Sequence, residues 1–202
     1  KTLGVWFYGN EYPFLSWMSR LGLATDGSAN GVTVLKQGWG VEPLTEGQAA
    51  CVSTMSYNEY WVVRDAGYTP EQLTVFKYQA EGASTLEDGL YVLEKNLGDD
   101  SFKDKMVRFV RASMKGWKYA EANPKEAASI ILDNDDAGVQ TEKHQIRMMG
   151  EIAKLTAGSN GSLDPSDYER TVKVLMSGAS DPVITKEPSG AWTHDITNAA
   201  LN

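Results

Sequence analysis

Apolar residues in the first 80 positions fall into short runs that alternate between two spacings. Compact runs rich in β-branched and aromatic residues predict strands over residues 3–8, 32–36, 49–55 and 73–78. The runs between them place apolar residues on one helical face, which predicts helices over residues 13–21, 41–47 and 57–66. Strands that alternate with helices indicate an α/β fold with a mostly parallel sheet.

The chain changes character after residue 80. One more short strand is predicted over residues 89–93, and helical spacing dominates from there. Four capping signals mark the expected helix starts: Asp99 or Asp100, Asn123 followed by Pro124, Thr141, and Asp164 followed by Pro165. The tail from Ser177 onward is rich in Gly, Pro and Ser and is expected to be irregular.

The four expected helices each carry a wide apolar stripe, yet only one strand accompanies them. Such stripes must be buried, either against one another in a bundle or against a sheet. The second arrangement is favoured here, with a sheet whose other strands lie outside this chain. The chain also begins directly in a strand pattern at Lys1–Trp6, without a signal peptide, which indicates a fragment of a longer protein.

Composition narrows the possible partners. The 202 residues carry a net charge of −8, which disfavours nucleic acid because phosphate binding needs a basic face. No apolar run approaches the roughly 20 residues of a membrane span. The single cysteine, Cys51, lies within an apolar strand pattern and is interpreted as a buried structural residue. Neither a metal site nor a cofactor is expected.

Two strand ends lead into the same tripeptide, Asn-Glu-Tyr. We call residues 9–12 the first corner and residues 57–60 the second corner. Ligand sites in open α/β sheets lie at the carboxyl ends of strands. Carboxylates accept hydrogen bonds, amides orient a ligand and aromatic rings cover it, which suits an amino-substituted heterocycle. The candidate ligand-binding residues are Asn10, Glu11 and Tyr12 in the first corner and Tyr57, Asn58 and Glu59 in the second.

Other interpretations of these residues stay open. Each corner is also what an ordinary helix start with an acidic first turn looks like. Glu11 and Glu59 could form an acid–base pair, although nothing local separates that from binding. Gln37, directly after the second expected strand, and Glu81, after the fourth, are further candidate ligand contacts. No dinucleotide, Walker or nucleophile-elbow motif is present, and no catalytic residue is assigned.

Several stretches together resemble the SsuA/THI5-like (NMT1/THI5) group of periplasmic solute-binding proteins of ABC transporters. They are Gly-Asn-Glu-Tyr-Pro-Phe (9–14), Leu-Lys-Gln-Gly (35–38), Met-Ser-Tyr-Asn-Glu-Tyr (55–60), Leu-Thr-Val-Phe (73–76), Glu-Asp-Gly-Leu-Tyr-Val (87–92), Ala-Ser-Met-Lys-Gly-Trp-Lys-Tyr-Ala (112–120) and Asn-Pro-Lys-Glu-Ala-Ala (123–128). The resemblance implies a type II periplasmic-binding fold with two lobes that close on a ligand. Residues 1–78 would be lobe two, and residues 79–202 would return to lobe one, of which only the helical C-terminal part is present.

The resemblance also implies a function. The protein would capture a small nitrogen heterocycle, similar to a thiamine-precursor pyrimidine or a flavin, between its lobes and deliver it to membrane permease subunits. It would act as a monomer in the periplasm, or lipid-anchored outside the cytoplasmic membrane. The alternatives are a sulfonate or other small organic ligand, the effector lobe of a transcription regulator, and an enzyme of pyrimidine synthesis. The fungal enzymes of this group carry a cysteine-rich motif that this chain lacks, so no enzyme activity is expected.

Overall fold

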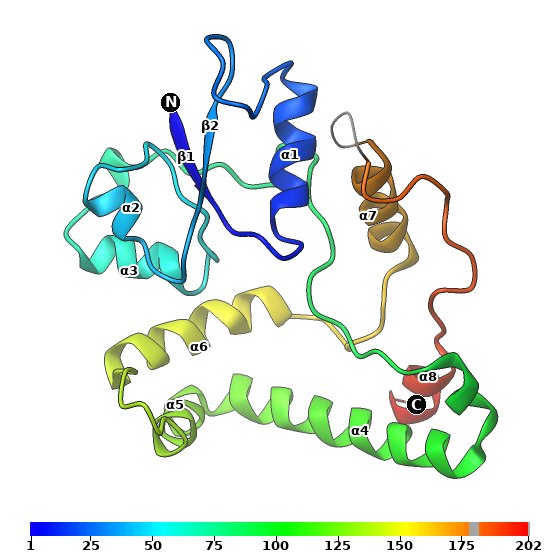
Figure 1. Cartoon of the computed structure of the whole chain (residues 1–202). Coiled ribbons are helices and arrows are strands. Elements are labelled where there is room, and N and C mark those ends of the chain that lie inside the picture. Colours follow the sequence, from blue (N-terminus) through cyan, green and yellow to red (C-terminus); the bar gives the residue numbers. More distant parts are fainter. Residues whose placement is uncertain (178–181, 202) are drawn as a thin grey trace. The chain divides into compact units, whose positions relative to one another are not determined.

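The structure is a computed structural model that describes residues 1–177 and 182–201. Contacts along the chain define two compact units, which can be followed by sequence colour in Figure 1. The first unit comprises Lys1–Glu87 with Asp164–Ser189, and the second comprises Asp88–Leu163 with Gly190–Asn202. The division at residue 78 concerns the lobes of a complete binding protein and stays a prediction.

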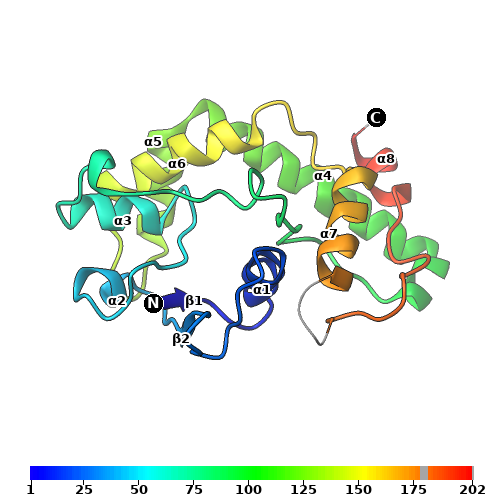
Figure 2. The same cartoon turned by 90° about the horizontal axis from the view of Figure 1, so that it is seen from above.

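The first unit is built on two parallel strands. Strand β1 (Thr2–Val5) pairs with β2 (Thr33–Lys36) in a register that runs from Thr2 opposite Thr33 to Val5 opposite Lys36. Helix α1 (Glu11–Arg20) connects them and lies beside the sheet in both views (Figures 1 and 2). A parallel pair with a helical crossover confirms the predicted α/β character of this region.

The core of the first unit lies between α1 and the two strands. Phe14 and Met18 of α1 are buried together with Val5 and Val32. On the same helix, Trp17 packs against aromatic rings from a later segment, with ring centroids 5.3 Å from Phe76 and 6.3 Å from Tyr78. The helical spacing of apolar residues in α1 therefore reflects burial against the sheet, as predicted.

The third predicted strand, over residues 49–55, is reduced to a short stretch beside β1. Its backbone follows β1 through hydrogen bonds from Ala50 N to Thr2 O (2.8 Å), from Gly4 N to Cys51 O (2.7 Å) and from Ser53 N to Gly4 O (3.1 Å). Only Cys51 forms a bridge with β1, opposite Leu3. The segment is thus parallel and correctly placed, but it is shorter than the apolar pattern suggests.

The predicted strands over residues 73–78 and 89–93 do not form, and both segments are irregular. Val75, Phe76 and residues 90–93 expose much of their apolar surface. Apolar alternation makes a segment fit for a sheet, but a strand is stabilised only when a neighbour supplies hydrogen bonds and cross-strand contacts. Nothing among the described residues pairs with these two segments along their length.

Further elements of the first unit surround this sheet. They are α2 (Glu42–Thr45), α3 (Glu59–Asp65), a short 3₁₀-helix η1 (Pro70–Gln72) and α7 (Pro165–Ser177). Helix α7 packs against α1, and the hydroxyl of Thr171 on α7 accepts a hydrogen bond from Leu86 N (2.8 Å). A distant part of the sequence therefore completes the first unit.

The described part of the second unit is helical. It contains η2 (Glu94–Gly98), α4 (Asp100–Ala122), α5 (Pro124–Asp133), α6 (Glu142–Thr156) and α8 (Asp195–Leu201). Two predicted caps in this unit are confirmed: Asp99 accepts hydrogen bonds from Ser101 N and Phe102 N, and Thr141 accepts one from His144 N. The predicted cap Asp164, at the start of α7 in the first unit, likewise accepts a hydrogen bond from Ser166 N (2.8 Å). At α5 the cap position is Asn123, but its amide instead donates to Tyr119 O of the preceding helix (3.0 Å).

The tail differs from its predicted irregular course. Residues 182–194 carry no regular element, but α8 follows them. The guanidinium of Arg111 on α4 donates to the carbonyls of Ala199 (3.0 Å) and Ala200 (3.1 Å), in the last turn of α8, where carbonyls lack the usual partner within the helix. Residues 178–181 and 202, also covered by the prediction, lie outside the described residues.

Candidate functional site

Three chain segments end at one edge of the small sheet. Because β1, β2 and the stretch at 50–53 run parallel, their carboxyl ends point the same way, and the loops that follow them start from a common edge. The first corner follows β1, a glycine-rich turn at 38–40 follows β2, and the second corner follows residues 50–53. The loops that carry the two corners therefore start from one edge of the small sheet.

Gln37 ties two of these segments together. Its amide donates to Gly40 O (3.1 Å) and Ser53 O (2.9 Å), and its side-chain oxygen accepts a hydrogen bond from Ser53 N (2.8 Å). The side chain is only 6% exposed. Gly4 makes room for it, since a Cβ at that position would lie 3.2 Å from the Gln37 oxygen and 3.0 Å from Val52. In this structure Gln37 positions the backbone of the edge.

A second link joins the loops after β1 and β2. The indole of Trp6 donates to Gly38 O (3.0 Å), and Gln37 N donates to Val5 O (2.9 Å). Together with the bonds made by Gln37, these contacts hold the three loops as one frame. The candidate residues on the loops are therefore carried by a shared and hydrogen-bonded support.

The first corner is partly exposed, and its polar side chains bond within it or to the chain just before it. The carboxylate of Glu11, in the first turn of α1, turns back to accept a hydrogen bond from Gly9 N (2.8 Å). Asn10 is exposed and donates from its amide to Phe7 O at 3.3 Å, while Tyr12 is half-buried. The acidic group is favourably placed at a helix N-terminus, as the structural interpretation of this corner expects.

The second corner has the same construction with more contacts. The carboxylate of Glu59, in the first turn of α3, accepts hydrogen bonds from Met55 N (2.9 Å) and from the amide of Asn58 (2.8 Å). Asn58, Glu59 and Tyr57 are all half-buried. The structure thus brings Asn58 and Glu59 together as a polar pair, with the ring of Tyr57 on the same turn.

Glu81 lies on a separate turn that is held by α1. The guanidinium of Arg20, the last residue of α1, donates to the backbone carbonyls of Glu81 and Gly82, the latter at 2.7 Å. Gly82 has a φ of +64°, a conformation that favours glycine. The contacts in this structure involve the backbone of Glu81, and its role in ligand binding stays a prediction.

Two aromatic residues at the same edge were not among the predicted contacts. Tyr8, directly before the first corner, is 91% exposed, and Trp39, between two glycines after β2, is 96% exposed. Tyr8 has a φ of 63° and is the only non-glycine residue with positive φ in the described part of the chain. This conformation costs on the order of 1–3 kcal/mol and tends to occur at functional sites. For Trp39 the sequence does contain a signal, because the glycines on either side of it let the backbone approach a ligand closely.

The half-buried Tyr78 packs against the core of the first unit. Burial raises the pKa of Tyr78 to about 12, with a further contribution from the neighbouring Cys51 and an opposing one from its hydrogen bond with Ser53. Burial also raises the pKa of the Cys51 thiol, against the effect of its hydrogen bond with Val52. A thiol with a raised pKa is a poor nucleophile at neutral pH, which agrees with the structural interpretation of Cys51.

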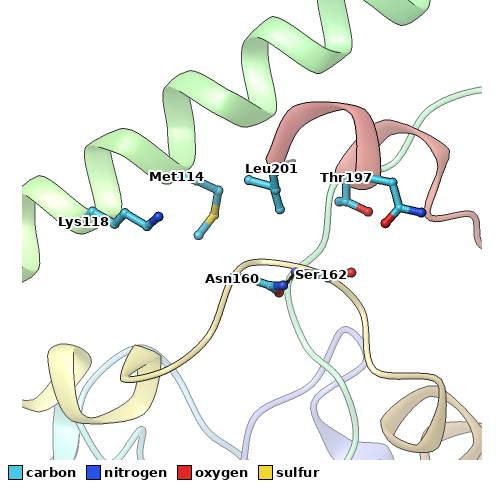
Figure 3. Close-up of a pocket in the computed structure, with 7 residues that line it drawn as sticks. Met114, Lys118, Asn160, Ser162, Thr197 and Leu201 are labelled. Carbon is cyan, nitrogen blue, oxygen red and sulfur yellow. Dashed lines mark hydrogen bonds between the residues drawn. The ribbon is translucent and has the colours of Figure 1, made fainter.

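A separate hollow lies within the second unit (Figure 3). Its volume is about 120 Å³, and it is lined by Met114 and Lys118 of α4, Asn160 and Ser162 of a loop, and Thr197, Asn198 and Leu201 of α8. Pockets for drug-sized ligands are usually about 300–1,000 Å³. The hollow is therefore too small for an aromatic heterocycle with substituents.

The described residues offer neither a metal cluster nor a membrane span. No group of three or more His, Cys, Asp and Glu side chains there is arranged to hold a metal ion. Within residues 1–177 and 182–201, no helix combines the length and the apolar character that a membrane span requires.

Comparison with known protein families identifies the class. The NMT1/THI5-like family model matches residues 1–127, which is more than half of the chain and includes both corners. The chain therefore belongs to the NMT1/THI5-like family. This family has a type II binding-protein fold, and it contains solute-binding proteins of ABC importers, typically outside the cytoplasm, as well as THI5 synthesis proteins. A comparison with curated proteins finds no match.

Proposed function

We propose that the chain is part of the substrate-binding component of an ABC importer, and that it captures a small, flat nitrogen heterocycle. The ligand class is a thiamine-precursor pyrimidine or a flavin-like ring. The observation that supports this most is the hydrogen-bonded edge itself, where two parallel segments end in matched carboxylate corners on one frame. Membership of a family with many substrate-binding proteins points the same way.

The carboxylates retain the capacity that this function needs. An ionised carboxylate can accept about four hydrogen bonds. Glu59 uses two of its acceptor positions on Met55 and Asn58, and Glu11 uses one on Gly9. The remaining lone pairs can accept hydrogen bonds from the ring N–H and amino groups of a ligand, while the present bonds keep each carboxylate in place.

The other candidate residues would supply the remaining ligand contacts. Asn10 and Asn58 orient the ligand, and the rings of Tyr12 and Tyr57 cover it. Gln37 would contribute through the edge, whose backbone it holds by three hydrogen bonds. In a complete two-lobe protein, Glu81 would add a carboxylate as the lobes close, and the closed form would be recognised by permease subunits outside the cytoplasmic membrane.

A thermal-shift screen of the full-length protein tests this function. The ligands are hydroxymethyl aminopyrimidine, thiamine, riboflavin and taurine, each at a large excess. Binding to the native state raises the unfolding free energy, by about 2.7 kcal/mol at a ligand concentration of 100 Kd. We expect a raised midpoint with at least one of the heterocycles and none with taurine.

A matched pair of variants ties the result to the edge. Glu59→Gln should abolish most of the shift because an amide offers fewer acceptor positions, whereas Glu169→Gln on the exposed surface of α7 should leave it unchanged. A shift with taurine alone would refute heterocycle capture. Formation of a new pyrimidine product during incubation would refute a purely binding role and support the enzyme alternative.

A further inference from the structure

Lys36, Phe7 and Tyr8 form a cluster at the sheet edge. The proposed binding of a heterocycle by the two corners does not involve these residues. The Nζ atom of Lys36 lies 4.5 Å from the ring centroid of Tyr8, 5.5 Å from that of Phe7 and 3.3 Å from the hydroxyl of Tyr8. Lys36 is the last residue of β2 and the register partner of Val5, the last residue of β1. Its ammonium group is therefore fixed at the edge from which the first corner begins.

Tyr8 is exposed to solvent on a backbone in an unfavourable conformation. The residue combines a left-handed φ of 63° with a side chain that is 91% exposed, so burial does not compensate the strained backbone. Such combinations persist where the surrounding structure fixes them, and they cluster at ligand sites. Here the loop is fixed by the hydrogen bond from Trp6 to Gly38 and by that from Asn10 to Phe7.

The charge of Lys36 is not neutralised by a nearby acid. Its ammonium forms no ion pair with a carboxylate of residues 1–177 or 182–201, although the chain carries a net charge of −8. The carboxylate of Glu11, in the first corner, accepts a hydrogen bond from Gly9 N. The ammonium has three donors, of which the Tyr8 hydroxyl takes one, and the remainder can serve an anionic group.

We infer that Lys36 and Tyr8 form a subsite for the acidic substituent of a ring ligand, so that the preferred ligand is a flat heterocycle carrying a phosphate or carboxylate. Tyr8 offers the ring face and Lys36 the counter-charge, and the exposed Trp39 after β2 is a second stacking surface. This inference rests on the proposed capture of a heterocycle and adds the charge of the ligand.

The test compares neutral and acidic members of ligand pairs by calorimetric titration of the full-length protein. The pairs are riboflavin with flavin mononucleotide, and hydroxymethyl aminopyrimidine with its phosphate ester and with its carboxymethyl derivative. For at least one pair we expect the acidic member to bind about tenfold more tightly or better, as a charge-assisted hydrogen bond provides. The preference should shrink as salt is raised, because screening weakens exposed charge pairs.

Variants of Lys36 and Tyr8 test whether these residues cause the preference for the acidic ligand. Lys36→Met should reduce it to about twofold or less while the neutral member keeps its affinity, since only the charged contact is lost. Lys173→Met, an exposed lysine of α7 in the same unit, should change neither. Tyr8→Gly keeps a backbone that tolerates positive φ but removes the ring, and should weaken both members; Tyr8→Phe should weaken neither by more than about twofold.

The possible failures are distinct. If wild-type protein binds no heterocycle, charged or neutral, the capture function and this subsite both fall. If it binds neutral and acidic members equally, or if Lys36→Met weakens both members to the same extent, capture stands and the anionic subsite is refuted. If the phosphate ester is preferred and the carboxymethyl derivative is not, the subsite stands as a phosphate site.

Discussion

The two corners share the sequence Asn-Glu-Tyr but differ in their surroundings. In the first, Glu11 accepts one hydrogen bond and its neighbour Tyr8 is exposed on a strained backbone. In the second, Glu59 accepts two hydrogen bonds on a half-buried turn. The tripeptide specifies a helix start with an acidic first turn in both places, while the segments around it decide burial and contact number. The first corner is therefore the more exposed of the two, and the second is held by more hydrogen bonds.

Removing the shared support should have the largest effect on both corners. Gln37→Ala deletes three hydrogen bonds and leaves Ser53 N, Ser53 O and Gly40 O without their partner. We expect a loss of about 2–4 kcal/mol in unfolding free energy, measured by urea denaturation. The exposed control Gln48→Ala should cost no more than about 0.5 kcal/mol. Equal costs would show that the frame does not depend on Gln37.

Alkaline pH should destabilise the first unit through ionisation of Tyr78, whose hydroxyl is hydrogen-bonded with Ser53. The pKa of Tyr78 is about 12 in the folded state against an ordinary value of 10.0, so its neutral form is favoured by folding. This contribution is fully present below pH 10 and is lost as pH rises toward 12, because the unfolded state releases the proton first. The loss should amount to about 2 kcal/mol, measured by urea denaturation across this range.

Tyr78→Phe isolates that effect from the other titrating groups. The variant lacks the ionisable hydroxyl, so its unfolding free energy should fall less steeply than that of the wild type above pH 10. Identical slopes for the two proteins would contradict the burial of the Tyr78 hydroxyl.

Truncating the corner glutamates should separate the corners directly. Glu59→Ala removes the acceptor of two hydrogen bonds on a half-buried turn and should cost about 1–2 kcal/mol. Glu11→Ala removes the acceptor of one bond at an exposed turn and should cost about 0.5–1 kcal/mol. Chemical denaturation measures both, with Glu169→Ala on α7 as the surface control. A larger cost at Glu11 would reverse the comparison.

The smallest effect concerns the backbone before each Asn-Glu pair. Tyr8→Gly should be more stable than Tyr8→Ala by about 1 kcal/mol, because glycine adopts positive φ without a Cβ clash. Tyr57, which is not in that conformation, should show the opposite order, with Ala more stable than Gly. Chemical denaturation of the four variants measures both differences in unfolding free energy. The same order at both positions would show that the backbone of Tyr8 is not strained.

Helix starts in this chain were predictable because their signals are local. Asp99 and Thr141 each bond to backbone N–H groups within the next three residues, so the sequence contains both partners. Strands were less predictable because their partners are remote. Residues 73–78 have the composition of a strand, but composition does not supply a neighbour, and the segment stays unpaired along its length in the described structure.

The candidate site also contains features that follow from local sequence and features that depend on remote residues. The acidic first turns at Glu11 and Glu59 follow from local sequence, and the structure places both after parallel segments. The function of Gln37 as a brace depends on Ser53, which is sixteen positions away, and could not be derived from its own strand. The exposure of Tyr8 depends on an unusual backbone angle, and an aromatic residue in a strand pattern favours the core.

The thiol of Cys51 gives this chain an intrinsic reporter. It is the only cysteine, it is half-buried, and its own carbonyl accepts one of the three backbone hydrogen bonds that attach residues 50–53 to β1. Because Cys51 is only partly exposed, a maleimide reagent should react faster with its thiol when that stretch separates from the sheet. The rate of alkylation therefore records how often the stretch opens, and a ligand that stabilises the second corner should slow the reaction without any label being introduced.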